Sequence, residues 1–184
     1  MEGARALVMG SDSAGLVSAA AAGDAAAFDA LVHQHSARVF RLALRMLGHR
    51  QDAEDVQQET FLRAYRKLHS FRGEAAFSTW LYSIASRLCL SRRRARRPEE
   101  PVNMDVADLC EDPQARLAAR ELAGRVQWAL AALAPSDRLL IVLKHIEELS
   151  HEEIAQVLGC SPESSRSRLL RAKRLFRQHY ERTE

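Results

Sequence analysis

Apolar side chains return every three or four positions along most of this chain, a spacing that predicts amphipathic helices. The first predicted helix covers residues 24–47 and ends at Gly48, because glycine favours the left-handed turn that follows many helices. Its inward-facing residues are expected to be Phe28, Leu31, His35, Val39, Leu42 and Met46. Two more helices are expected from Asp52 to about His69 and from about Phe77 to Ala95. Their inward sides are expected to carry Phe61, Ala64, Tyr65 and Leu68, and Trp80, Leu81, Ile84 and Leu88, respectively.

The helical pattern is interrupted at residues 98–112, which contain two prolines, six acidic residues and no regular apolar spacing. Such a composition is typical of a flexible acidic linker. Helical spacing resumes after Asp112 and Pro113, a pair of residues that suits the start of a helix. The inward-facing residues of the next two helices are expected to be Leu117, Leu122, Val126, Leu130 and Leu133, then Leu139, Leu140, Leu143 and Ile146.

The stretch SHEEIAQVLGCSP predicts two capped helices with a tight turn between them. Ser150 and Glu153 have the spacing of a capping box at the start of a short apolar helix. Gly159 favours the turn, and Ser161 followed by Pro162 suits the start of the next helix. This layout is that of a helix-turn-helix, whose second helix enters the major groove of DNA in many proteins.

The composition agrees with an all-α fold, since 47% of the 184 residues are apolar and only 8 are glycine. We expect two small helical domains, residues 24–97 and 113–184, joined by the flexible acidic linker at 98–112. The second domain would contain the helix-turn-helix. Residues 1–23 are expected to form a mobile N-terminal extension.

Positive charge is concentrated in two segments, although the formal net charge is only +3. Residues 87–97 hold six arginines and no acid, and residues 166–182 hold seven basic residues and one acid. Two separate basic segments indicate two contacts with a polyanion such as nucleic acid. The alternative is a pair of solvated helix ends whose charges complement the helix dipole.

The last predicted helix has an apolar side and a side rich in serine and arginine. Ser165, Leu169, Ala172, Phe176 and Tyr180 are expected to pack inward. The opposite side carries Ser164, Ser167, Arg171 and Arg174, flanked by Arg166, Arg168 and Lys173. Serine and arginine side chains can hydrogen-bond base edges and phosphates in a major groove. The alternative is a solvated helix that closes a bundle.

The second predicted helix has an outward face of different chemistry. This face carries Asp55, Gln58, Glu59, Leu62 and Arg66. Duplex DNA would repel its acidic groups, so a contact with another protein is favoured over a contact with nucleic acid. A solvated helix without a partner is the alternative.

Aromatic and basic residues alternate in the loop before the third helix and along that helix. They are Phe71, Arg72, Phe77, Thr79, Trp80, Tyr82 and Arg87. Such a mixture suits stacking on unpaired bases, and the following run Arg92–Arg97, which includes Arg93, could track phosphates. The alternative is that most of these aromatic residues belong to the core.

The sequence gives no reason to expect catalysis, a metal ion or a cofactor. The three cysteines are far apart, and the seven histidines form no HExxH motif. We also expect no membrane insertion, because no segment approaches about 18 consecutive apolar residues, and we expect a cytoplasmic protein.

Three motifs resemble bacterial RNA polymerase sigma factors of the extracytoplasmic-function type, a branch of the sigma-70 family. They are DAEDVQQETFLRAYRKL, FRGEAAFSTWLYSIA and SHEEIAQVLGCSPESSRSRLLRAK, in the family's order and spacing. The resemblance implies an alternative sigma factor that binds core RNA polymerase and directs transcription from specific promoters. It also implies an anti-sigma protein as a partner. The two domains would correspond to sigma regions 2 and 4.

The resemblance assigns each outward face a partner. Asp55, Gln58, Glu59, Leu62 and Arg66 would bind the β′ clamp helices of core polymerase, with a further contact between the second domain and the β flap. The start-proximal (−10) promoter box would be read and melted by Phe71, Arg72, Thr79, Trp80, Arg87, Arg92 and Arg93. The upstream (−35) box would be read by Ser164, Arg166, Ser167, Arg168, Arg171 and Arg174.

The chain departs from the family's usual pattern at a few positions. Glu163, Ser164 and Ser165 stand where the family often has Gly-Thr-Val. Arg87 stands where asparagine is frequent, and Gln57 replaces an aliphatic residue. Two other functions stay open on the residues alone: a free-standing dimeric helix-turn-helix regulator, and a nucleic-acid enzyme.

Overall fold

The computed structural model describes residues 14–95 and 113–182, and for residues 113–120 it describes the backbone alone. The described residues are helical and contain no strand. Residues 14–21 form a short helix. The later elements in chain order are α2 (Ala25–Leu47), α3 (Arg50–Lys67), the 3₁₀ turn η1 (Leu68–Ser70), α4 (Phe77–Ala95), α5 (Pro113–Ala131), α6 (Pro135–His145), α7 (His151–Leu158) and α8 (Pro162–Glu181).

Local sequence signals explain where these helices begin and end. The Asp24 side chain caps α2 by accepting a hydrogen bond from the Ala27 amide, and Gly48 ends the helix in the left-handed conformation at φ 81°. Both hydrogen bonds of the predicted capping box form at Ser150 and Glu153. The helix boundaries expected from the sequence are therefore confirmed to within a few residues. The expected linker at 98–112, with its Asp112 cap, lies outside the described residues, as do residues 1–13 of the N-terminal extension expected at 1–23. Residues 14–21 of that extension form a helix instead, and Val17 and Ala20 are buried in the core.

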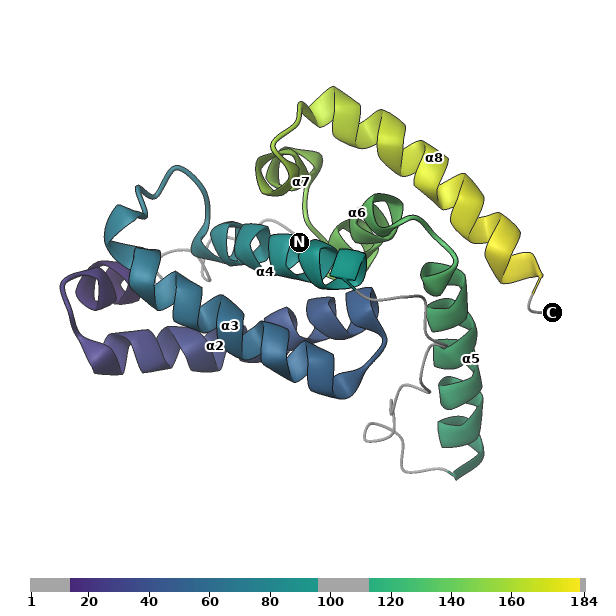
Figure 1. The fold of residues 1–184 in the computed structure, drawn as a ribbon, viewed down its shortest axis with the longest axis horizontal. Coiled ribbons are helices and arrows are strands. Elements are labelled where there is room, and N and C mark those ends of the chain that lie inside the picture. Colours follow the sequence, from purple (N-terminus) through teal and green to yellow (C-terminus); the bar gives the residue numbers. More distant parts are fainter. Residues whose placement is uncertain (1–13, 96–112, 183–184) are drawn as a thin grey trace, which may run out of the picture.

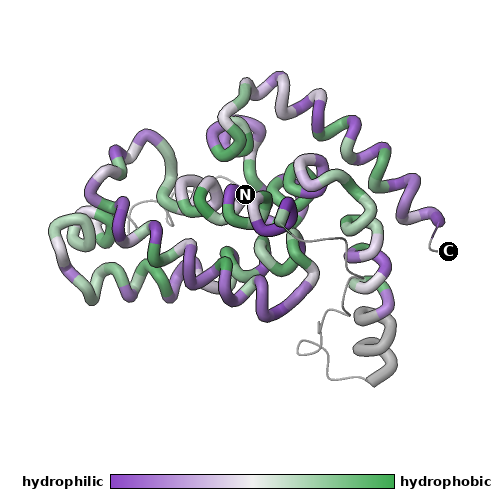
Figure 2. Tube along the Cα trace, viewed as in Figure 1, coloured by the Kyte–Doolittle hydropathy of each residue, from purple (hydrophilic) through white to green (hydrophobic). Residues whose placement is uncertain are grey.

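The first half of the described chain is a three-helix layer in which α2 packs against α3 and α4 (Figure 1). In the second half, α8 packs against α5, α6 and α7 and runs along the outer side of the molecule (Figure 1). Figure 2 shows hydrophilic residues spaced along the whole length of α8 and apolar residues gathered toward the centre of the molecule. The recognition helix predicted from the sequence thus has one long solvated side.

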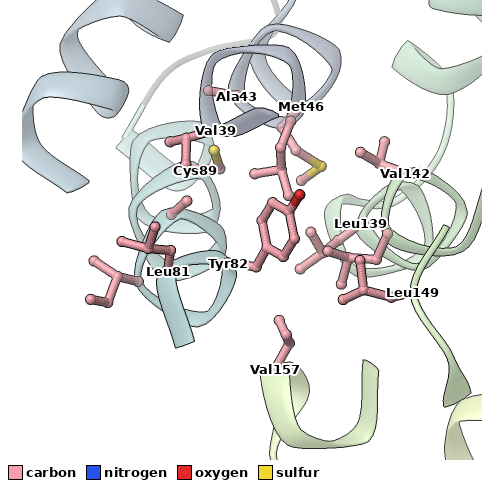
Figure 3. Packing of buried hydrophobic residues seen from close by; sticks show 14 of the residues in the cluster. Val39, Ala43, Met46, Leu81, Tyr82, Cys89, Leu139, Val142, Leu149 and Val157 are labelled. Atoms are coloured by element: carbon pink, nitrogen blue, oxygen red, sulfur yellow. The ribbon is translucent and has the colours of Figure 1, made fainter. Parts of the chain in front are cut away.

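The two halves pack directly against each other, which the sequence pattern alone did not predict. Helix α2 contacts α5 and α6, and α4 contacts α6 and α7. Buried apolar residues from both halves form one contiguous cluster. Figure 3 shows part of it: Tyr82 of α4 lies between Met46 of α2, Leu139 of α6 and Val157 of α7. Helix α6 is buried on all sides, from Asp137 through Leu143.

Two residues expected to face inward are exposed instead. Tyr65 is 54% exposed, and its ring packs edge-on against Phe28, at 4.9 Å between ring centroids. Leu122, in the middle of α5, is 53% exposed. Figure 1 shows that the first turns of α5 extend beyond the other helices. Helical spacing identifies the apolar side of a helix, but whether another element covers that side depends on the tertiary arrangement.

Candidate functional site

The outward face of α3 borders a groove between α3 and α4. Asp55, Gln58, Glu59 and Leu62 line this groove together with residues near the end of α4, and its volume is about 730 Å³. Leu62 is 44% exposed and adds apolar surface to this charged helix face. Arg66 is also exposed on α3 but does not line the groove. The structure therefore brings together four of the five residues that the sequence analysis grouped on this face.

Arg92, expected to contact promoter DNA, lies in this groove and is bound to acidic residues of α3. Its Nη2 donates to Asp55 Oδ2 at 2.8 Å, and its Nε lies 3.7 Å from Asp52 Oδ1. Arg92 also lines the groove beside Asp55. Because its charge is paired with α3 here, its position favours a role in shaping the α3 face over a role in binding phosphate.

Arg93 is likewise used within the fold. Its Nη1 donates to the carbonyl of Met46 at 3.1 Å, near the C-terminal end of α2. Burial lowers the pKa of the Arg93 guanidinium. Among the described arginines at the end of α4, Arg92 and Arg93 are half-buried and Arg94 is exposed.

The loop before α4 and the start of that helix hold a cluster of aromatic rings. The Phe71 and Trp80 centroids are 5.1 Å apart, and Phe77 lies within 6 Å of both. Phe77 is buried, whereas Phe71 and Trp80 are half-buried. Both readings of the sequence therefore hold in part: Phe77 belongs to the core, and Phe71 and Trp80 keep surface that a ligand could contact.

A cavity of about 1110 Å³ adjoins this aromatic cluster. Its walls come from residues 14–21, α2, the loop at 71–78 and Gln156 of α7. Arg38 and Arg72 contribute positive charge, and His35 lies against Phe77 with the ring centroids 5.4 Å apart. Burial, with a smaller effect of Arg38, lowers the pKa of His35, so the imidazole is favoured in its neutral form.

Thr79 does not lie on the surface where the sequence analysis placed it. It is 2% exposed, at the contact of α4 with α7, and its Oγ1 donates to Glu153 Oε1 at 3.4 Å. Tyr82 is also buried, at 3% exposed. Arg87, by contrast, is exposed as expected. In this arrangement α7 covers the part of α4 on which Thr79 lies.

Helix α8 presents the predicted faces. Ser165, Leu169 and Ala172 are buried, and Phe176 and Tyr180 are half-buried. The opposite side carries Ser167, Arg171 and Arg174, all exposed, and Ser164, which is half-buried. Of the flanking residues, Arg166 is exposed and Arg168 is half-buried.

Two arginines of α8 are paired with acidic residues of neighbouring helices. Arg166 Nη2 lies 3.0 Å from Glu152 Oε1, and both side chains are more than half exposed. Arg171 Nη2 donates to Asp137 Oδ1 at 3.1 Å and Oδ2 at 3.2 Å. The Asp137 side chain is only 3% exposed. The acid is therefore buried in the Arg171 pair and exposed in the Arg166 pair.

Two departures from the usual family pattern have local structural partners. Ser165 is fully buried, and its hydroxyl lies 3.2 Å from Nδ1 of His151. Gln57 donates from Nε2 to the carbonyl and the hydroxyl of Ser36, at 2.8 and 2.7 Å. Polar groups at both positions are thus satisfied by hydrogen bonds, as burial requires.

Sequence reasoning missed a leucine on the exposed side of α8. Leu170 is 60% exposed and lies on the same side of the helix as Ser167 and Arg174. An apolar side chain among polar ones can contact the methyl group of thymine. Its exposure could have been inferred from the sequence, since its position on the helix is away from Leu169 and Ala172.

Sequence reasoning also missed the polar contacts between the halves. Glu147, in the loop after α6, accepts from Arg41 Nε and Nη2 at 2.9 and 3.2 Å and from the Tyr82 hydroxyl at 2.7 Å. Its side chain is 1% exposed. Burial and the hydrogen bond to Glu147 raise the pKa of Tyr82, which stays a neutral donor. A buried carboxylate of the second half is therefore held by two side chains of the first.

A second set of interdomain contacts lies at the C-terminal end of α2. Arg138 of α6 donates from Nη1 to the Met46 carbonyl at 2.7 Å and from Nε to the Leu130 carbonyl. Gln127 of α5 donates to the Arg45 carbonyl at 3.3 Å. The end of a helix carries unpaired carbonyls and a partial negative charge, which these donors complement. The sequence signal for these contacts is Arg138 itself, a single arginine directly before the apolar run of α6.

Family models match both halves of the chain. The model described as Sigma-70 region 2 matches residues 31–99, and the model described as Sigma-70, region 4 matches residues 124–176. Among known proteins, RNA polymerase sigma-H factor of Pseudomonas aeruginosa is 35% identical over 163 residues, 82% of this chain and 84% of that protein. The extracytoplasmic-function sigma factor SigW of Bacillus subtilis is 33% identical over 168 residues, 85% of this chain and 90% of that protein.

This chain belongs to the extracytoplasmic-function sigma factors. It is an alternative sigma factor, a protein that directs transcription initiation together with RNA polymerase. The family assignment decides against the free-standing regulator left open by the residues alone, and the family consists of initiation factors rather than enzymes.

The structural comparison agrees with the family assignment of the sigma factor. The structure of CnrH in complex with the cytosolic domain of CnrY matches with a TM-score of 0.73 and 28% identity, over 92% of this chain and 97% of that chain. The structure of RpoE in complex with the anti-sigma factor NepR from Bartonella quintana matches in fold, with a TM-score of 0.65 and 22% identity. No helix in the described ranges 14–95 and 113–182 is long and apolar enough to cross a membrane.

Proposed function

We propose that this sigma factor divides its contacts among three surfaces. The α3 groove binds core polymerase, the aromatic loop before α4 binds the start-proximal promoter box, and the exposed side of α8 binds the upstream box. The observation that carries the proposal is the separation of chemistry: acid, amide and apolar groups at the groove, aromatic rings at the loop, and arginine with serine on α8.

The polymerase-binding surface is proposed to consist of Asp55, Gln58, Glu59 and Leu62, with Arg92 as a new member. Arg92 holds the Asp55 carboxylate at 2.8 Å, so it fixes the direction in which that carboxylate is presented. Arg66 would contact the polymerase only at the edge of this surface, because it lies outside the groove.

The surface for the start-proximal box is proposed to centre on Phe71, Arg72 and Trp80, with the exposed Arg87 and Arg94 as cations further along α4. The half-buried rings of Phe71 and Trp80 can stack on unpaired bases, and the arginines can bind phosphates. Contact between DNA and Thr79 requires α7 to move away from α4, because Thr79 is buried between these helices.

The partners follow from the same division. Core polymerase and promoter DNA are the working partners, and the β flap is the proposed contact of the second half. An anti-sigma protein is a further proposed partner, supported by the likeness to CnrH in its complex with the cytosolic domain of CnrY. The sigma factor itself would add no chemistry, since the polymerase makes RNA, and it would act in the cytoplasm beside the polymerase.

In vitro transcription tests the proposed function directly. Purified core polymerase, this chain and genomic DNA fragments are expected to yield RNAs with a small set of defined 5′ ends. Mapping these ends would identify the two promoter boxes. Core polymerase alone and core polymerase with heat-denatured chain serve as controls. Identical RNA ends with and without the folded chain would refute the proposal.

The polymerase-binding surface is tested by the double substitution Asp55→Ala and Gln58→Ala. We expect core polymerase to bind this variant at least about tenfold more weakly, because two residues at the centre of the surface lose their polar groups. The matched control is Gln51→Ala with Glu54→Ala, a pair of the same residue chemistry on α3 that does not line the groove. Equal affinities of wild type and the first variant would place the polymerase contact elsewhere.

A further inference from the structure

Asp137 is a buried acid that contacts the exposed side of the recognition helix. It lies in the first turn of α6 and is 2% exposed as a residue. Both of its carboxylate oxygens accept hydrogen bonds from Nη2 of Arg171, at 3.1 and 3.2 Å. The Arg171 side chain, in contrast, is 66% exposed. One end of this ion pair is therefore fixed in the protein interior, and the other reaches solvent.

The position of the Asp137 carboxylate is fixed by its surroundings. The first turn of a helix favours negative charge, and the Asp137 amide is itself bonded to the Ala134 carbonyl at 3.0 Å. The residues that follow it in α6, from Arg138 to Leu143, are all buried. A carboxylate anchored in this way restricts the arginine that it binds to a narrow range of conformations.

The ion pair uses only part of the Arg171 guanidinium. Asp137 accepts from Nη2, while Nε and Nη1 donate to none of the residues in the described parts of the chain. These donors lie on an exposed side chain that shares its side of α8 with Ser167 and Arg174. An arginine held through one nitrogen can still offer the others to a base edge or a phosphate.

Two opposite consequences for DNA binding follow from this pair. The negative charge of Asp137 offsets the positive charge of Arg171, which weakens attraction to any phosphate. The same contact orders a side chain that would otherwise lose about 2 kcal/mol of rotamer entropy on binding. The charge effect acts on all DNA alike, whereas the ordering effect acts only where Arg171 makes a defined contact.

We propose that Asp137 is a positioning residue for promoter recognition, which orients Arg171 so that its free donors meet one base pair or phosphate of the upstream box. This inference rests on the proposed role of α8. The burial of Asp137 favours the ordering effect over the charge effect, because a rigid buried partner limits the conformations of Arg171. Arg166 provides the contrast, since both acids paired with it are exposed: the Glu152 side chain is 62% exposed and that of Glu163 is 78% exposed.

The test is a double-mutant cycle on the full chain assembled with core polymerase. The variants are Asp137→Asn, Arg171→Ala and their combination. The probe is a duplex carrying the upstream box of a promoter mapped in the transcription experiment, and a scrambled duplex of the same length is the reference. Affinity is measured by fluorescence anisotropy. Glu152→Gln is the matched control, because it neutralises the closer of the two exposed acids that pair with Arg166.

We expect Arg171→Ala to weaken binding to the specific duplex about 10- to 100-fold, and Asp137→Asn to weaken it about 3- to 10-fold. Binding of Asp137→Asn to the scrambled duplex should be unchanged or tighter, because a negative charge is removed. In the Arg171→Ala background, Asp137→Asn should have no further effect. Glu152→Gln should not weaken specific binding.

Each other result overturns a distinct statement. Unchanged or tighter specific binding by Asp137→Asn, with Arg171→Ala weakened, refutes positioning and leaves the role of α8 intact. Equal losses from Asp137→Asn in both backgrounds show a purely structural role for Asp137. No effect of Arg171→Ala removes Arg171 from the DNA contact and refutes the inference with it. Asp137→Ser, which suits a first helical turn, repeats the cycle if the asparagine variant unfolds.

Discussion

Replacing Arg138 with alanine is expected to lower the free energy of unfolding by about 3 kcal/mol. Arg138 is 1% exposed, and its guanidinium joins the Leu130 and Met46 carbonyls of the two halves. The substitution leaves a cavity in the interface and removes two buried hydrogen bonds. Each carbonyl keeps one other donor, Arg93 for Met46 and the Leu133 amide for Leu130, so neither is left without a partner.

A compensating term keeps this expected loss moderate. Burial, with a smaller effect of Arg93, lowers the pKa of Arg138, which shows that the protein interior disfavours its charge. Removing the guanidinium relieves that cost. Arg138 has no acidic partner within the described residues. The partial negative charge at the C-terminal end of α2 instead stabilises part of the arginine's charge in the wild type.

The measurement is urea denaturation of wild type, Arg138→Ala and Arg138→Met. Methionine keeps much of the side-chain volume, so the difference between the two variants reports the cavity, and the remaining loss reports the hydrogen bonds. A free energy of unfolding within 0.5 kcal/mol of wild type for the alanine variant would mean that burial of the charge costs as much as its contacts contribute.

Glu147→Ala is expected to cost about 2–4 kcal/mol and to uncouple the unfolding of the two halves. Its carboxylate is the acceptor for Arg41 and for the buried Tyr82 hydroxyl. Arg41 is 45% exposed and can turn to water, which reduces the cost on its side. The Tyr82 hydroxyl has no such freedom, because that residue is 3% exposed. Both partners belong to the first half, so the loss falls on the contact between halves.

The two tryptophans allow each half to be followed separately. Trp80 lies in α4 and Trp128 in α5, and the chain has no other tryptophan. Two variants are made that each keep one tryptophan, either Trp80 or Trp128. When Glu147 is intact, the urea unfolding transitions followed by the two tryptophans should coincide. With Glu147→Ala the two midpoints should separate. Glu148→Ala, at the exposed neighbouring position, is the control. Coincident midpoints in the Glu147 variant would show that apolar packing alone couples the halves.

The sequence predicted the helices and their ends because the signals are local. Asp24, Gly48 and the Ser150–Glu153 box act within one helical turn of where they stand. The helix-turn-helix and the inward side of α8 follow from the same kind of signal. These features need no knowledge of which other helix lies nearby.

The packing of one half on the other could not be obtained from the periodicity of single helices. Helical spacing marks one apolar side, whereas α4 buries a second side under α7, including Thr79. One feature of the sequence does indicate this packing: Leu139–Leu143 is apolar without interruption, which is typical of a helix covered on all sides. The ion pairs of Arg92 could not be predicted from local sequence, because its partners Asp52 and Asp55 lie about forty residues earlier in the chain.

The position of α7 over Thr79 has a thermodynamic consequence for any molecule that binds this part of α4. Such a molecule must first separate two helices that already bury surface against each other. Its observed dissociation constant is therefore the intrinsic one divided by the fraction of molecules in which the helices are apart. Each 1.4 kcal/mol of packing between α4 and α7 makes that constant about ten times larger.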